Sequence, residues 1–167
     1  MADEIGQGDA RPTRRVADSL TVATRMVMPS DINGFDWLFG GRLMAWIDEA
    51  AGICGRRHSG CRITTACVDT LTFRHPVRIT DIIEVVARVT FVGRTSLEVR
   101  VDTFVDEPAG AKRLVNSAYL TEVCIDDTGH PVPCPYGLEL VSDDEREEWE
   151  GARSRREIRR GRAEEGV

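Results

Sequence analysis

The sequence has few histidines and no cysteine pattern typical of a metal site. It contains three histidines and five cysteines in 167 residues. The cysteines form no C-x-x-C pair and have no histidine at zinc-ligand spacing, so we expect no metal ion. A Cys-His nucleophile also has no supporting motif. An odd number of unpatterned cysteines is typical of free thiols in a reducing compartment, which predicts a cytoplasmic protein.

Long apolar runs and an excess of basic residues are also missing. No segment approaches the roughly 18 consecutive apolar residues of a membrane span, and residues 1–15 do not resemble a signal peptide. The net charge of −6 disfavours binding to nucleic acid, which depends on neutralising phosphates. A small phosphorylated ligand needs only two or three arginines and is not excluded. The sequence also contains no glycine-rich nucleotide-binding motif.

The chain has the size and composition of one globular domain, with 41% hydrophobic and 30% charged residues. Residues 1–17 are polar and lack a hydrophobic period, so we expect a disordered arm. Residues 18–137 hold the domain. Residues 138–167 mix acidic and basic side chains with few apolar anchors, which predicts a solvated helix or a tail.

The order of elements within the domain predicts its fold class. Residues 20–28 are rich in β-branched side chains and predict a strand that ends at Pro29. Residues 41–55 carry apolar side chains at helical spacing, and Gly55 with the two arginines after it is a stop signal. Strands are predicted over residues 63–73, 82–92, 96–105 and 114–125, and the short gaps between them favour antiparallel neighbours. The result is an α+β hotdog fold, an antiparallel sheet wrapped around one long central helix. Because such a sheet has exposed edges, we expect at least a homodimer.

The segment around this helix carries the candidate chemistry. A loop bearing Asn33 leads to Gly40 and Gly41, where free backbone amides at the helix start can polarise a carbonyl oxygen. Asp48 follows about two turns later beside the apolar strip. A carboxylate there can activate water or attack an acyl carbon, although its position also suits an ordinary boundary carboxylate.

Several motifs together resemble one known family. The segment from Met28 to Gly52 reads Met-Pro-x-Asp-x-Asn, five variable positions, Phe-Gly-Gly, and then Met-x-x-x-Asp-Glu-Ala-Ala-Gly. The further matches are Thr65-Ala-Cys-Val-Asp69, Phe73-Arg-His-Pro76, Asp81, Val92-Gly-Arg-Thr-Ser96, Tyr119-Leu-Thr and Asp126-Asp-Thr-Gly129. Over about residues 20–135 the chain therefore resembles the acyl-CoA hydrolases of the YciA and brain acyl-CoA hydrolase group.

The resemblance implies a thioesterase that converts acyl-CoA to free CoA and a carboxylic acid. It needs no cofactor, because CoA is part of the substrate and product. It implies a dimer that assembles further into a trimer of dimers, with active sites at the dimer interface. Asp48 would be the base or nucleophile, Asn33 of a neighbouring copy would orient the thioester or water, and Gly40 and Gly41 would supply oxyanion donors.

The resemblance also implies a CoA-binding turn at Gly93, Arg94, Thr95 and Ser96, although a plain hairpin turn fits the same residues. His75 stands where relatives often carry lysine. Asp36 and Trp37 depart from the family's pattern before the paired glycines, and Glu122 replaces a usual aromatic residue, so the acyl-chain preference is not transferable.

Two other functions fit the same fold. One is a non-catalytic acyl-CoA-binding sensor or scaffold, which the presence of both Asn33 and Asp48 disfavours. The other is a dehydratase, which would need a histidine between Ser30 and Gly55, and that segment has none.

Overall fold

A computed structural model describes residues 11–165. Within them the main elements are α2 (Gly40–Ser59) and the strands β2 (Thr21–Met26), β3 (Arg62–Phe73), β4 (Ile82–Val92), β5 (Ser96–Asp106) and β6 (Lys112–Ile125). The remaining elements are β1 (Thr13–Arg15), α1 (Val16–Ser19), β7 (Gly137–Glu139) and α3 (Asp143–Glu165), with short 3-10 turns at Pro29–Asp31 and Pro108–Gly110.

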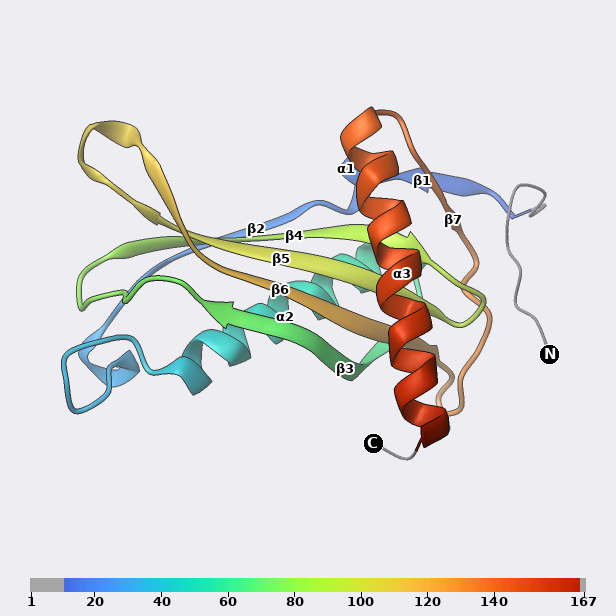
Figure 1. The fold of residues 1–167 in the computed structure, drawn as a ribbon, viewed down its shortest axis with the longest axis horizontal. Helices are drawn as coiled ribbons and strands as arrows, with labels where there is room; N and C mark the ends of the chain where they lie inside the picture. Colours follow the sequence, from blue (N-terminus) through green and yellow to red (C-terminus); the bar gives the residue numbers. More distant parts are fainter. Residues whose placement is uncertain (1–10, 166–167) are drawn as a thin grey trace.

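In the described chain, five strands form one antiparallel sheet in the order β2-β4-β5-β6-β3. The helix α2 runs along one face of this sheet (Figure 1). Its apolar strip is buried against the sheet and consists of Leu43, Ile47, Ala50, Ala51 and Cys54. This arrangement confirms the predicted α+β hotdog fold.

The helix α2 is longer than its sequence pattern predicts, because Gly55 does not end it. A Cβ atom at Gly55 would lie 3.2 Å from a methyl group of Leu97 and 3.5 Å from the Cγ of Glu122, so this glycine allows close packing of helix on sheet. The helix ends instead at Gly60, which has a left-handed φ of 72° and donates its N–H to the carbonyl of Arg56.

The expected pairing of β3 with β4 was wrong. Among the described strands β3 pairs with β6 and lies at the far edge of the sheet, and residues 74–81 carry the chain across to β4. This connection is tied to the loop before α2, because the N–H of Leu38 donates to the carbonyl of Val77 at 2.8 Å. Most side chains of β3 are exposed or half-buried in the single chain. The strand is thus an open edge at which a second copy could pair.

The expected disordered arm was wrong for residues 11–17, and residues 1–10 lie outside the described part. The strand β1 pairs in parallel with β7, far away in sequence. The guanidinium of Arg14 donates to the carbonyls of Arg57 and His58 and stacks 3.7 Å from the ring of Tyr136. These partners are distant along the chain, so the ordered structure of residues 11–17 could not be predicted from a local hydrophobic period.

The C-terminal residues form the helix α3, which crosses the outer face of the sheet, opposite α2 (Figure 1). The rings of Trp149 and Phe91 pack with centroids 4.4 Å apart, and Ala152 is buried. The predicted helix is therefore anchored on the sheet and is not simply solvated. Between α3 and the sheet lies a hollow of about 580 Å³.

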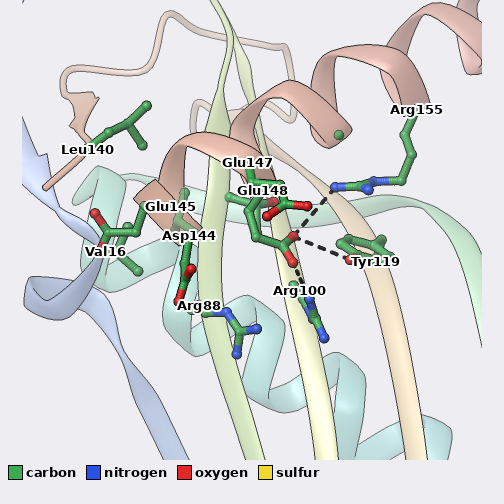
Figure 2. A pocket seen from close by; sticks show the side chains of 13 residues that line it. Val16, Arg88, Arg100, Tyr119, Leu140, Asp144, Glu145, Glu147, Glu148 and Arg155 are labelled. Atoms are coloured by element: carbon green, nitrogen blue, oxygen red, sulfur yellow. Dashed lines mark hydrogen bonds and ion pairs between the residues drawn. The ribbon is translucent and has the colours of Figure 1, made fainter. Parts of the chain in front are cut away.

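Charged side chains across this hollow bind one another. Figure 2 shows Glu148 of α3 pointing toward Arg100 and Tyr119 of the sheet, to which it is linked by an ion pair and a hydrogen bond. Arg155 of α3 donates to both carboxylate oxygens of the buried Glu98, at 2.8 and 3.2 Å. These ion pairs and hydrogen bonds thus hold α3 against the sheet.

Replacing Arg155 with methionine is expected to lower the free energy of unfolding by about 3 kcal/mol, because it leaves the buried carboxylate of Glu98 without its cation. Urea denaturation would measure the loss. The matched control is Arg153→Met on the same helix. Arg153 forms only an exposed ion pair with Glu150, so its loss should change the free energy by less than about 0.5 kcal/mol. Equal effects of the two substitutions would contradict the anchoring role of Arg155.

Candidate active site

A groove of about 610 Å³ runs between α2, β3 and the end of β6. Asp48 of α2 is exposed in it. The hydroxyl of Thr65, on β3, donates to the Oδ1 of Asp48 at 2.6 Å. The helix thus supplies a carboxylate and the adjacent edge strand supplies the group that holds it.

Glu122 lies beneath this pair and is completely buried. The register of β3 and β6 places Glu122 directly opposite Thr65, and the pairing slips between Thr65 and Cys67. Such bulges re-aim side chains and are frequent beside active sites. Burial raises the pKa of Glu122 to about 7; the hydrogen bond with Thr65 opposes the rise, and the charge of Asp48 adds to it.

Asn33 lies in a second hollow, of about 380 Å³, at the N-terminus of α2. Its side-chain oxygen accepts the N–H groups of Phe35 and Trp37 at 2.9 and 3.3 Å, and so shapes the loop. Gly40, His75 and Trp37 line the same hollow. Trp37, which departs from the family's pattern, thus lies at the hollow that contains Asn33, whereas Asp36 occupies the turn with a left-handed φ of 60°.

The two glycines at the start of α2 are packed closely against aromatic rings. A Cβ atom at Gly40 would lie 3.4 Å from the ring of Phe73, and one at Gly41 would lie 2.6 Å from the ring of Phe39. The first hydrogen bonds of the helix are donated by Arg42 and Leu43 to the carbonyl of Phe39. The amides of Gly40 and Gly41 precede these bonds, as the positions of predicted oxyanion donors require.

Within one chain, the predicted catalytic residues do not come together. Gly40, beside Asn33, and Asp48 lie eight positions apart on α2, which corresponds to about 12 Å along the helix axis. Asn33, Gly40 and His75 therefore share one hollow, whereas Asp48 meets Thr65 and Glu122 in another.

The predicted CoA-binding turn lies at the other end of the sheet from the start of α2 (Figure 1). Gly93 is buried, its N–H donates to the carbonyl of Ser96 at 2.7 Å, and its carbonyl accepts from Arg11. The carbonyls of Arg94 and Thr95 accept the N–H groups of Cys134 and Cys124. The amide of Gly93 is thus engaged within the turn, and Arg94 is exposed.

Sequence reasoning did not identify Thr65 and Glu122 as neighbours of Asp48. Thr65 appeared only inside a matched motif, and Glu122 only as a departure from the family's pattern. Neither has a local signal, because their positions beside Asp48 follow from strand register and not from spacing along the chain. The bulge at Thr65 is likewise a property of the pairing of β3 with β6 and cannot be read from the sequence of β3 alone.

The described residues also bear on metal binding, on the buried histidine and on membrane spans. No group of three or more histidine, cysteine or carboxylate side chains there is placed to bind a metal ion. His58 is buried between Ser19 and the carbonyl of Gly137, and burial lowers its pKa, so its role is in the core. No helix in the described part is long and apolar enough to cross a membrane.

Comparisons with known proteins agree on one family. The profile described as thioesterase superfamily matches residues 35–111. An uncharacterised acyl-CoA thioester hydrolase of Bacillus subtilis is 37% identical over 124 residues, which cover 74% of this chain and 72% of that protein.

Solved structures give the same result. An acyl-CoA hydrolase of Staphylococcus aureus, solved with butyryl coenzyme A, coenzyme A and coenzyme A disulfide, has a TM-score of 0.87 at 35% identity and covers 93% of this chain and 94% of that one. The same enzyme has been solved as variants in which an asparagine, an aspartate or a threonine is replaced by alanine. A hexameric acyl-CoA thioesterase has a TM-score of 0.86 at 34% identity, covering 91% of this chain and 97% of that one.

Proposed function

Because the chain belongs to the thioesterase superfamily, we propose that it is an enzyme that hydrolyses acyl-CoA thioesters to free CoA and a carboxylic acid. The observation that carries the proposal is the exposed carboxylate of Asp48, held at 2.6 Å by the hydroxyl of Thr65 in an open groove. The names of the relatives, which are acyl-CoA thioester hydrolases, support the same reaction.

Asp48 acts in this proposal as the base or as the nucleophile. As a base, it takes a proton from water while the water oxygen attacks the thioester carbon, and the proton then passes to the CoA thiolate as the C–S bond breaks. As a nucleophile, its oxygen attacks the same carbon, the C–S bond breaks and CoA leaves as the thiolate. Water then hydrolyses the resulting mixed anhydride to the carboxylic acid and the Asp48 carboxylate, and the proton released from water passes to the CoA thiolate. In both routes the hydrogen bond with Thr65 engages one carboxylate oxygen and leaves the second for the reaction.

The amide of Asn33 comes from a neighbouring copy in this proposal, and the site forms between two subunits. Three observations support it: Asn33 and Asp48 occupy separate hollows in one chain, β3 is an open edge, and aromatic side chains next to the Asn33 hollow are exposed. The exposed aromatic side chains are those of Phe35, Phe39 and Phe73. Gly40 and Gly41 then donate amides to the oxyanion, and Arg94 meets CoA phosphate.

The substituted residues of the S. aureus enzyme support this grouping. Its asparagine, aspartate and threonine are separated by 15 and 17 positions, and Asn33, Asp48 and Thr65 have the same separations here. The hexameric relative supports a higher assembly, for which we propose a trimer of dimers. All five cysteines, which lie in the described residues, are free, and this supports a cytoplasmic location.

The test is release of free thiol from a series of acyl-CoA substrates by the unmodified protein. We expect saturable turnover on at least one chain length, with kcat in the ordinary enzyme range of about 1 s⁻¹ or more, and one thiol released for each acid formed. Isothermal calorimetry with CoA provides the second readout. Tight CoA binding without thiol release from any substrate would overturn hydrolysis in favour of a sensor or scaffold.

A further inference from the structure

The hydroxyl of Thr65 lies between two carboxyl groups but carries only one proton. Its oxygen is 2.6 Å from the Oδ1 of Asp48, and 3.2 and 3.3 Å from the two carboxyl oxygens of Glu122. If both carboxyl groups were ionised, one of these contacts would place oxygen against oxygen without a proton between them. The short distance assigns the threonine proton to Asp48, so the contact with Glu122 needs a proton of its own.

The surroundings of Glu122 explain how it keeps that proton. Its side chain is completely buried between β6 and α2, with Gly55 close to its Cγ, whereas Asp48 is exposed. Burial disfavours the charged form of a carboxyl group, and the neighbouring charge of Asp48 disfavours it further. The charged and titratable groups around it are Asp48, Glu49, Cys54 and Arg56 from α2 and Arg62 from β3.

We propose that Glu122 is a positioning residue that works in its neutral form, donating its proton to the oxygen of Thr65 so that the proton of Thr65 is committed to Asp48. This inference rests on the hydrolytic role proposed for Asp48. The series of hydrogen bonds from Glu122 to Thr65 to Asp48 fixes the orientation of the reacting carboxylate without placing a second negative charge against it. No bond to substrate is made by Glu122.

This arrangement makes turnover depend on pH in a defined direction. When Glu122 loses its proton, the donor to Thr65 disappears and two carboxylates compete for one hydroxyl proton. Asp48 then loses its fixed orientation. Because the pKa of Glu122 is raised to about 7, kcat should fall as the pH rises through that value. Below that pH, Glu122 keeps its proton and the series of hydrogen bonds should be intact.

The test compares kcat between pH 5.5 and 9 for the unmodified protein, Glu122→Gln and Glu122→Leu, corrected for spontaneous thioester hydrolysis. We expect the unmodified protein to lose about tenfold in kcat with an apparent pKa near 7. The Gln variant donates an amide N–H to Thr65 at every pH and should lose the alkaline decline. The Leu variant removes both the donor to Thr65 and the carboxylate that competes for its proton. Thr65 is then held from one side only, so kcat should be lower than in the Gln variant at every pH, with no decline near pH 7. A Gln variant that retains the decline, or that is as slow as the Leu variant, would overturn the proposal.

A spectroscopic readout separates this inference from the proposed function. Infrared difference spectra of the unmodified protein against Glu122→Gln should contain the C=O band of a protonated carboxyl group at pH 6, replaced by a carboxylate band at pH 8.5. If Glu122 is ionised at pH 6, the proposed role of neutral Glu122 is wrong even if acyl-CoA is hydrolysed. If no acyl-CoA is hydrolysed by the unmodified protein, the role in catalysis fails with the proposed function, while the spectra still decide the protonation of Glu122.

Discussion

Replacing Asp48 with asparagine is expected to lower kcat for acyl-CoA hydrolysis by about 10³-fold, because the amide can neither accept a proton from water nor attack the acyl carbon. Asparagine has the same shape, and its side-chain oxygen still accepts the hydrogen bond from Thr65. Asp48 is also exposed, so no cavity or buried charge results. Steady-state thiol-release kinetics should therefore give a low kcat with little change in KM.

The matched control is Asp127→Asn, which makes the same chemical change in an exposed turn. Asp127 is paired with Arg62, and both side chains are largely exposed, so kcat should stay within about twofold of the unmodified protein. Size-exclusion chromatography and thermal melting would establish that both variants keep their assembly. Unchanged turnover of Asp48→Asn would remove Asp48 from the reaction.

Elements with a strong local period were predictable from the sequence. The strand β4 has the predicted bounds, Ile82–Val92, and β3, β5 and β6 begin and end within two residues of the predicted strands. The start of α2 was also predicted to within one residue. In each case, alternation or helical spacing of apolar side chains records which face is buried.

Strand partners and chain-distant anchors were not predictable in this way. The alternation of side chains in β3 indicates which of them share a face, but not which strand lies next to it. The connection of several residues between β3 and β4 is compatible with a hairpin and also with a crossing to a strand farther away. The segment from Arg11 to Ser19 is held by residues near 57 and 137, which no short window contains. Gly55 was read as a stop, whereas it lies inside the helix where a Cβ atom would approach a methyl group of Leu97 on the facing strand to 3.2 Å.

The candidate site was predictable where residues belong to one motif. Asn33, Gly40, Gly41 and Asp48 lie in a single segment, and the resemblance assigned them together. Thr65 and Glu122 meet only because β3 and β6 pair in one register, so the contacts of Asp48 and Glu122 with the hydroxyl of Thr65 become visible only in three dimensions. The assigned roles of Asp48 and Asn33 remain predictions, and their placement in separate hollows suggests the decisive experiment.

Mixing two inactive variants, Asp48→Asn and Asn33→Asp, is expected to restore about a quarter of the unmodified activity. If each site takes Asp48 from one subunit and Asn33 from the other, a mixed dimer contains one doubly damaged site and one intact site. Random pairing makes about half of the dimers mixed, and each has one working site of two. Aspartate is the suitable replacement for Asn33, because its oxygen still accepts the N–H groups of Phe35 and Trp37 and preserves the loop.

Coexpression with two different affinity tags would yield the mixed dimers for thiol-release kinetics. The quarter applies to the unseparated population, and the purified mixed dimers should have about half of the unmodified activity, because each has one working site of two. The control mixes Asp48→Asn with Thr65→Val. Asp48 and Thr65 bind each other within one chain, so every site in such a dimer keeps one defect and no activity should return. Recovery in the first mixture alone requires a site built from two chains, because independent complete sites in each subunit could not be repaired by exchange. Purified mixed dimers of Asp48→Asn and Asn33→Asp that stay inactive would mean that both residues act within one chain, and the shared site would have to be abandoned.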